Sequence, residues 1–231
     1  MLISAHSGGA EQARSGSLAA YQAVASSGAE YAEFDVRLGD DGTLLAQHSA
    51  GDLAWPAREV MRVLAADGVR GHVDLKGTGF ERAVVAQALE SFGPGGFVVT
   101  TPDPESVAAI RDEFPAVPVG LSVGFGPASI SRDLRRLRWP LSFPLDAVRA
   151  TGASWVAMNY RYARPSVLDQ CVGAGLRIMV WTVNDDRRLD RFLADSRVSI
   201  LVTDRPGYAV RRRQALIGAP GPRAPGRGSG A

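Results

Sequence analysis

The chain has 231 residues, of which 45% are hydrophobic and 22% are charged. This length fits one large α/β barrel better than two domains, and the apolar content excludes a globally disordered chain. The formal net charge of +2 is too small to indicate a nucleic-acid-binding face. The chain has one cysteine, which excludes a disulfide-stapled secreted scaffold.

The first residues, MLISAHSGGAEQ, contain no basic segment followed by an apolar stretch, so they do not resemble a signal peptide. No apolar run approaches the length of a transmembrane helix. We therefore expect a cytoplasmic protein without stable membrane insertion.

Short apolar segments, many of them rich in β-branched residues, alternate along the chain with longer helix-like segments. The predicted strands are residues 2–6, 31–37, 71–76, 96–101, 117–123, 154–159, 176–183 and 199–204, with an extra short strand at 44–48 after a DDG turn. The predicted helices are residues 17–28, 56–68, 80–93, 103–114, 131–139, 164–175 and 186–196.

Eight strands separated by helices predict a (β/α)8 TIM barrel over residues 1–217. The alternative is an open doubly wound sheet, which usually carries a glycine-rich phosphate turn after its first strand. The segment HSGGAEQ does not match that turn. Residues 218–231, in which Gly, Pro, Arg and Ser dominate, predict a disordered tail.

Three carboxylates are predicted to lie together. Glu33 and Asp35 are two apart on one strand and therefore point to the same side, and Asp74 lies on the next barrel strand. Such a cluster repels itself unless a cation neutralises it, and oxygen ligands favour Mg²⁺ or Ca²⁺ over zinc. The alternative for Glu33 and Asp35 is the solvent side of an edge strand, because Phe34 and Val36 alternate with them.

Further polar groups fall at strand ends, where a barrel of this type carries its chemistry. His6 closes the first strand and His48 the extra one, which suits proton transfer near neutral pH. Lys76 suits a phosphate oxygen. Trp181 is a candidate cover over the substrate, with core packing as its alternative. A metal, a lysine and two histidines together indicate phosphodiester cleavage.

The remaining polar residues have simpler interpretations. His72 is predicted to be a hydrogen-bonded interior residue, with a role in orienting a metal ligand as the alternative. Asn184 and Asp204 are expected to be turn and cap residues. Glu11 is a candidate for a further acid near the site, and Cys171 is expected to be buried and inert.

Five segments, ISAHSGG, YAEFDVRLGDDGTLLAQH, VDLKG, VWTVND and LVTDRPG, resemble in order the motif series of the glycerophosphodiester phosphodiesterases. The resemblance covers about residues 2–206. It implies a TIM barrel, one divalent cation, and hydrolysis of glycerophosphodiesters to an alcohol and glycerol 3-phosphate as part of lipid metabolism. It implies that His6 and His48 are the catalytic pair. It also implies that Glu33, Asp35 and Asp74 hold the metal and that Lys76 binds the phosphate.

The chain departs from that family at four positions. Ser7 stands where the family usually has an arginine, Ser15 and Ser49 replace usual acids, and Asp74 replaces a usual glutamate. In addition, only 25 residues separate His48 from Asp74, which predicts that the usual small insertion domain is absent.

Some of these departures resemble the sphingomyelinase D and phospholipase D toxins, which share the barrel and its two histidines. In that group a hydroxyl of the substrate attacks phosphorus and a cyclic phosphate is released. A phospholipase D-like lipase is therefore one alternative function. A barrel that has lost catalysis and only binds phosphorylated ligands is another, which Ser7 and Ser49 favour. The WTVND and TDRPG segments favour the glycerophosphodiesterases.

Overall fold

The structure is a computed structural model that describes residues 1–49, 51–124 and 143–218. Eight parallel strands form a closed barrel in the order β1-β2-β5-β6-β7-β8-β9-β10, and β10 pairs back onto β1. Their bounds are β1 Leu2–Ala5, β2 Tyr31–Leu38, β5 Arg70–Leu75, β6 Phe97–Thr101, β7 Val119–Val123, β8 Trp155–Asn159, β9 Arg177–Trp181 and β10 Val198–Thr203. The predicted TIM barrel is confirmed, and an open doubly wound sheet is excluded.

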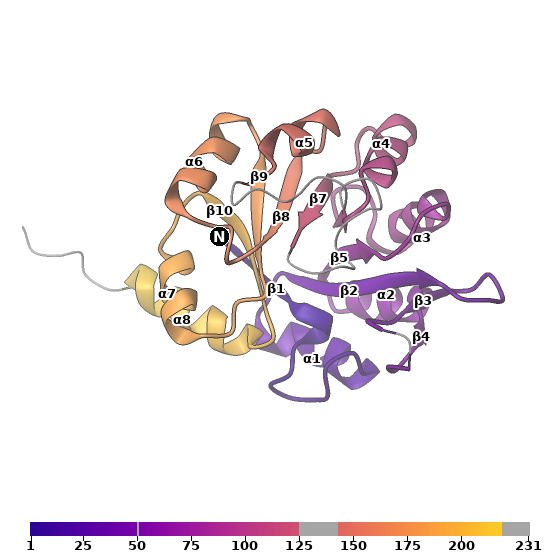
Figure 1. The fold of residues 1–231 in the computed structure, drawn as a ribbon. Helices are drawn as coiled ribbons and strands as arrows, with labels where there is room; N and C mark the ends of the chain where they lie inside the picture. Colours follow the sequence, from indigo (N-terminus) through magenta and orange to yellow (C-terminus); the bar gives the residue numbers. More distant parts are fainter. Residues whose placement is uncertain (50, 125–142, 219–231) are drawn as a thin grey trace, which may run out of the picture.

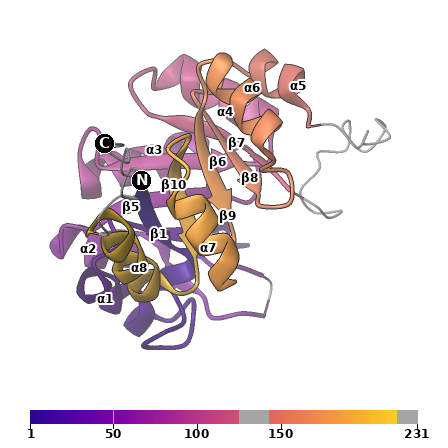
Figure 2. The ribbon, with the colours of Figure 1, turned by 90° about the vertical axis from the view of Figure 1, so that its left-hand side faces the viewer.

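Helices surround the strands on the outside of the barrel (Figures 1 and 2). Their bounds are α1 Leu18–Ser27, α2 Ala57–Ala66, α3 Glu81–Phe92, α4 Pro104–Glu113, α5 Leu145–Ala150, α6 Pro165–Gly173, α7 Asp186–Leu193 and α8 Pro206–Gly218, with a 3₁₀ helix η1 at His6–Gly8. Helices α5 and α8 were not among the predicted ones. The helix predicted at 131–139, and the tail apart from its first residue, lie outside the described residues.

The extra strand after the DDG turn is also present. β3 (Leu44–Ala46) runs antiparallel to the end of β2, and β4 (Trp55–Pro56) pairs with β3. β3 ends two residues before His48, so His48 lies in the loop after the strand and not on it as expected.

Successive side chains of β2 point alternately to the helices outside the barrel and to the barrel interior. Phe34 is fully buried and meets the ring of Tyr21 on α1, at 6.3 Å between ring centroids. Glu33 and Asp35 therefore point to the opposite side, into the barrel. Since helices cover the outer side of a barrel strand, the polar residues of the strand are confined to the barrel interior and the rim.

The amino-terminal end of the barrel is closed by aromatic side chains. Tyr31 and Trp155 are buried inside the barrel, and the guanidinium groups of Arg70 and Arg177 lie 4.2 and 4.0 Å from their ring centroids. These cation–π contacts keep the charges at the surface while the rings fill the interior. Space for a ligand is therefore left at the carboxyl-terminal end of the strands.

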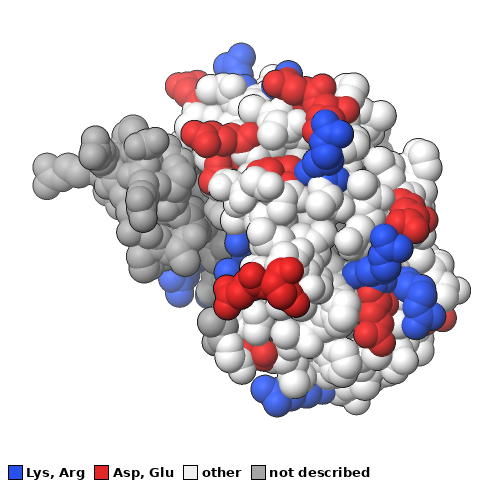
Figure 3. Space-filling model, turned by 90° about the vertical axis from the view of Figure 1, so that its right-hand side faces the viewer, with Lys and Arg blue, Asp and Glu red and all other residues white. Residues whose placement is uncertain are grey.

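The surface carries no broad basic region on the face shown in Figure 3, where acidic and basic side chains are interspersed. None of the helices in the described parts of the chain has the length and apolar character that crossing a bilayer requires.

Candidate active site

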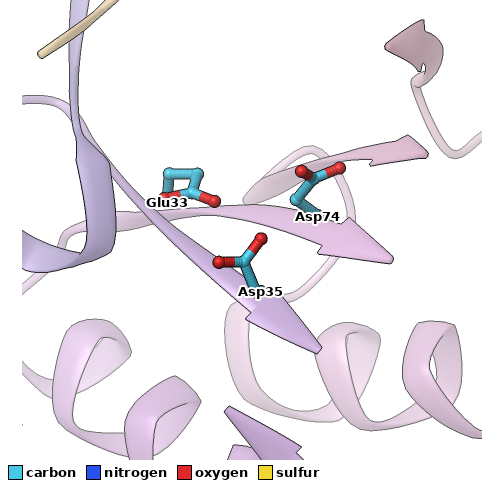
Figure 4. Close-up of side chains that lie close together, drawn as sticks. All are labelled: Glu33, Asp35 and Asp74. Atoms are coloured by element: carbon cyan, nitrogen blue, oxygen red, sulfur yellow. The ribbon is translucent and has the colours of Figure 1, made fainter. Parts of the chain in front are cut away.

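The three predicted carboxylates converge at the carboxyl-terminal end of two neighbouring strands (Figure 4). In the parallel pairing of β2 with β5, Asp35 lies opposite Asp74 and Glu33 opposite His72. One oxygen from each of the three acids lies within 4.8 Å of the others. Glu33 and Asp35 are only 4% and 3% exposed, so the interpretation of these two acids as the solvent side of an edge strand is wrong.

Two groups of the chain compensate part of this charge. The backbone N–H of Ser7 donates to Glu33 Oε2 at 2.8 Å. The Lys76 ammonium lies 2.9 Å from Asp35 Oδ1 and 2.5 Å from Asp74 Oδ2. Burial and the Asp35 carboxylate nevertheless raise the pKa of Glu33 to about 7, although the charges of His6 and Lys76 act in the opposite direction.

The donor set fits a hard divalent cation. Glu33, Asp35 and Asp74 supply only carboxylate oxygens, from two neighbouring strands, and burial together with the Asp35 carboxylate raises the pKa of Glu33, as expected where carboxylates gather without a cation between them. Carboxylate oxygens are the ligands that Mg²⁺ and Ca²⁺ prefer. These three residues would hold the ion.

His6 is oriented by a carboxylate that the sequence did not single out as functional. Its Nδ1 donates to Asp204 Oδ1 at 2.7 Å, and Asn184 Nδ2 donates to Asp204 Oδ2 at 2.5 Å. Asn184 is fixed in turn, since its Oδ1 accepts from the Thr203 hydroxyl and the Asp204 N–H. Asn184 and Asp204 were expected to be turn and cap residues, and the structure adds a role that this expectation did not include, the orientation of His6. Their place just beyond the carboxyl-terminal ends of β9 and β10, three residues and one residue after the strands, was the available signal.

His48 is oriented in the same way by a member of the acid cluster. Its Nδ1 donates to Asp35 Oδ2 at 2.6 Å. The rings of His6 and His48 lie 6.0 Å apart between centroids. Because a carboxylate only accepts hydrogen bonds, each Nδ1 keeps its proton, and Nε2 is the ring atom that can exchange one.

In the absence of a bound cation, the neighbouring carboxylates favour the charged form of both rings. Burial by itself lowers the pKa of His6, but the Glu33 carboxylate and the Asp204 hydrogen bond raise it to about 9. The hydrogen bond to Asp35 raises the pKa of His48. Burial opposes ionisation of Asp35, yet its bonds to His48 and Lys76 hold its pKa below the ordinary value.

A chain of buried side chains supports the third acid from inside the barrel. The Thr100 hydroxyl donates to Asp74 Oδ1 at 2.8 Å and contacts His72 Nε2 at 3.0 Å. The Thr100 hydroxyl has one proton, which it donates to Asp74. In its contact with His72 the hydroxyl oxygen is therefore the acceptor, so Nε2 is the protonated nitrogen of the His72 ring. His72 Nδ1 is then unprotonated and accepts from the Ser4 hydroxyl at 3.2 Å. Burial lowers the pKa of His72 to about 4, which keeps the ring neutral in this arrangement.

Ser7 lies in an unusual backbone conformation beside His6. It is a buried residue with a φ of 45°, a region that residues other than glycine rarely adopt. The following Gly8 packs against α1 so closely that a Cβ would lie 2.9 Å from backbone atoms of Ala20 and Tyr21. This turn directs the Ser7 N–H to Glu33, and it places a short hydroxyl where the resemblance implies an arginine.

Two cavities meet at the histidine pair. The larger, of about 720 Å³, contains the three acids, Lys76 and Trp181 among its lining residues. The smaller, of about 400 Å³, lies on the side of Arg14 and Asp52. Both include His6, His48 and Asp35 in their walls, so the two cavities adjoin at these residues.

Two other predicted residues take no part in this arrangement. The Glu11 carboxylate accepts from the backbone N–H groups of Gly207 and Tyr208 at the start of α8, so its candidacy as a further acid of the site is wrong. Cys171 is buried in α6, as expected.

Comparison with known proteins identifies the same barrel elsewhere. No protein-family model and no curated protein sequence matches the chain. Solved structures match over nearly the whole chain. A glycerophosphodiester phosphodiesterase from Parabacteroides distasonis has 17% sequence identity and a TM-score of 0.74, with coverage of 94% of this chain and 98% of that one.

Two further structures give the same result. The Thermotoga maritima glycerophosphodiester phosphodiesterase has 17% identity and a TM-score of 0.68, with 91% and 97% coverage. An Oleispira antarctica phosphodiesterase, solved in complex with the product sn-glycerol-3-phosphate, has 16% identity and a TM-score of 0.71, with 95% and 97% coverage. The chain therefore has the TIM-barrel fold of the glycerophosphodiester phosphodiesterases.

Proposed function

We propose that this protein is a metal-dependent phosphodiesterase that hydrolyses glycerophosphodiesters to an alcohol and glycerol 3-phosphate. The observation that carries the proposal is the pair of histidine rings 6.0 Å apart, each bound through Nδ1 to a carboxylate, beside a cluster of three acids. A binding protein has no need of two oriented proton carriers. The likeness in fold and the product bound by the Oleispira antarctica enzyme support the choice of substrate.

In the proposed reaction the two histidines exchange protons at Nε2. One ring removes a proton from the attacking oxygen, a neighbouring hydroxyl of the substrate or a water molecule, as a new P–O bond forms. The other ring protonates the departing alcohol as the old P–O bond breaks. Where a substrate hydroxyl attacks, the product is a cyclic phosphate that water then opens. Proximity of an internal nucleophile contributes up to roughly 7–11 kcal/mol in favourable cases.

The surrounding residues bind and orient the diester. Glu33, Asp35 and Asp74 would hold a divalent cation, Mg²⁺ or Ca²⁺, which supplies a positive charge for the phosphoryl oxygens. Lys76 supplies a second positive charge from the same side, and Trp181 lies in the wall of the same cavity. The side chains so assigned are His6 and His48 for catalysis, Glu33, Asp35 and Asp74 for the metal, and Lys76 and Trp181 for the substrate. We assign the protein to the cytoplasm.

Phosphorus NMR of the purified protein tests this proposal. The substrates are glycerophosphocholine and lysophosphatidylcholine, with Mg²⁺, Ca²⁺ or EDTA, beside the variants His6→Ala and His48→Ala. Glycerol 3-phosphate that disappears with EDTA and in both variants is the expected result. A persistent cyclic phosphate from the lysolipid alone would indicate the phospholipase D-like alternative. Metal binding without turnover of any diester would indicate a barrel that has lost catalysis.

A further inference from the structure

The smaller cavity contains two charged side chains that the proposed reaction does not use. Arg14 and Asp52 line it together with Ser15, Gln47 and the two histidines. Neither belongs to the wall of the larger cavity, which contains the metal cluster and Lys76. The histidine pair and Asp35 are common to both walls. A phosphodiester bound at that pair could extend one ester substituent into each cavity.

The charges of Arg14 and Asp52 are available to a ligand. Within the described residues, no hydrogen bond or ion pair is formed by the Arg14 guanidinium or by the Asp52 carboxylate, and the two do not pair with each other. Lys76 differs from them, because it is already bound to two carboxylates.

The backbone of each of these residues takes part in turn hydrogen bonds. The Arg14 carbonyl accepts from the Ser17 N–H at 3.0 Å, in the turn that precedes α1. The Asp52 N–H donates to the Ser49 carbonyl at 3.0 Å, and the Asp52 carbonyl accepts from Gln47 Nε2 at 3.1 Å. Both charged residues are exposed and belong to hydrogen-bonded turns.

We propose that the smaller cavity binds the alcohol half of the diester, and that it selects a zwitterionic alcohol whose carboxylate contacts Arg14 and whose ammonium contacts Asp52. Serine is the simplest alcohol with both groups. The inference rests on the proposed function, since it names the substrate class of the same site. The leaving oxygen takes its proton from a histidine, so the free amino-acid alcohol departs on this side, and glycerol 3-phosphate remains on the side of the acids.

The charge pattern distinguishes this class from its neighbours. An alcohol with a cationic head alone, such as choline or ethanolamine, leaves Arg14 without an anion, and a neutral alcohol such as glycerol leaves both charges unused. Arginine and carboxylate groups also match in geometry, because the guanidinium can donate two parallel hydrogen bonds. The cavity, at about 400 Å³, falls in the range of small-molecule pockets.

Four diesters with the same glycerol 3-phosphate half test the inference: glycerophosphoserine, glycerophosphoethanolamine, glycerophosphocholine and glycerophosphoglycerol. KM and kcat are measured for the unchanged protein and for Arg14→Gln and Asp52→Asn. Arg58→Gln is the control, because Arg58 pairs with Glu90 on the outer helices and lines neither cavity.

We expect the lowest KM for glycerophosphoserine. Arg14→Gln should raise that KM by about three- to tenfold, the range for a charged hydrogen bond at a partly exposed site, and leave the other three within about twofold. Asp52→Asn should raise KM for the serine, ethanolamine and choline diesters together, because all three alcohols carry a positive charge. The kcat values should stay unchanged, because these contacts are as strong in the bound substrate as in the transition state.

Equal KM values for all four diesters, or an Arg14→Gln effect of the same size on each, would overturn the inference while the proposed function stands. If no diester is turned over, the proposed function fails, and NMR titration with glycerophosphoserine still decides the subsite. Binding that weakens in Arg14→Gln but not in Arg58→Gln would support the subsite, and equal Kd values in the three proteins would overturn it.

Discussion

The two histidines of the site look alike but depend on different parts of the barrel. His6 follows β1 and takes its carboxylate, Asp204, from the end of β10, where Asn184 holds that carboxylate in turn. His48 follows β3 and takes its carboxylate from Asp35, which also belongs to the acid cluster and binds Lys76. The His6 side chain is 26% exposed and the His48 side chain 56%.

This difference separates two kinds of control over proton transfer. The partner of His6 lies outside the acid cluster, so a change there alters the orientation of one ring and leaves the metal ligands in place. The partner of His48 is itself a metal ligand in the proposed function. A cation bound at the cluster therefore competes with His48 for the charge of Asp35, and metal loading and the protonation of His48 are coupled.

The largest effect is expected for Asp35→Asn. This change removes one metal ligand and the acceptor that orients His48, so hydrolysis should fall by more than about 10³-fold, since each of these contributions is large by itself. Mg²⁺ and Ca²⁺ titrations by calorimetry should show weaker binding in the same variant. Undiminished metal affinity would contradict the shared role of Asp35.

Asp204→Asn should affect proton transfer by His6 and leave metal binding unchanged. The kcat should fall by about 10²-fold, because the amide can no longer fix the tautomer and the charge of His6. The Kd for the metal should stay within about twofold of the unchanged protein. A loss of metal affinity equal to that in Asp35→Asn would show that the orientation of His6 and the binding of the metal are not independent.

Thr100→Val tests the buried support of the third acid. The change removes the hydroxyl that donates to Asp74 and leaves the proton on His72 Nε2 without its acceptor. Outer hydrogen bonds of this kind are worth about 10- to 100-fold in metal affinity. We expect a loss near the lower figure, measured by calorimetry. Thr101→Val is the matched control, because its buried hydroxyl accepts from the Asp103 N–H and does not contact the acids. Equal losses in the two variants would indicate general destabilisation of β6.

The smallest effect is a pH dependence of stability in EDTA. Glu33 has an ordinary pKa of 4.5 and a folded pKa of about 7, so it binds more protons in the folded state. Its contribution to the free energy of unfolding is complete below pH 4.5 and is lost as the pH rises to about 7. Glu33→Gln should therefore gain stability relative to the unchanged protein between pH 5 and pH 7.5. Urea unfolding at both pH values measures this, and excess Mg²⁺ or Ca²⁺ should reduce the difference. An unchanged difference between the two proteins would contradict the raised pKa.

The barrel could be predicted because its strands are short, apolar and separated by regular helical segments. Helix α8 was missed because its three consecutive arginines, 211–213, obscure the apolar positions on which recognition of a helix depends. The role of Glu11 was also beyond prediction. Its carboxylate meets the start of α8 only through contacts 196 and 197 residues away along the chain, and spacing carries no information at that range.

The acids and histidines could be placed together because two rules apply to them: residues two apart share a side of a strand, and barrel chemistry gathers at strand ends. The hydrogen bonds between these side chains could not be predicted from the sequence. Asp204 was assigned to a turn because an aspartate after a strand usually has that role, and only the closed barrel places it beside His6. The chain Ser4–His72–Thr100–Asp74 joins three strands whose register the sequence does not specify.

The pairing of β1 with β10 also determines when in synthesis the site can form. His6 and Asp204 are 198 residues apart, and the Arg213 guanidinium donates to the Met1 carbonyl, so that α8 lies beside the start of the chain (Figure 2). The barrel cannot close until the last strand, β10, has been synthesised and pairs with β1. Contacts of such long range make folding slow. A nascent chain on the ribosome can hold all three acids long before it holds an oriented His6. Proton transfer by that residue therefore reports the completion of folding, not merely its beginning.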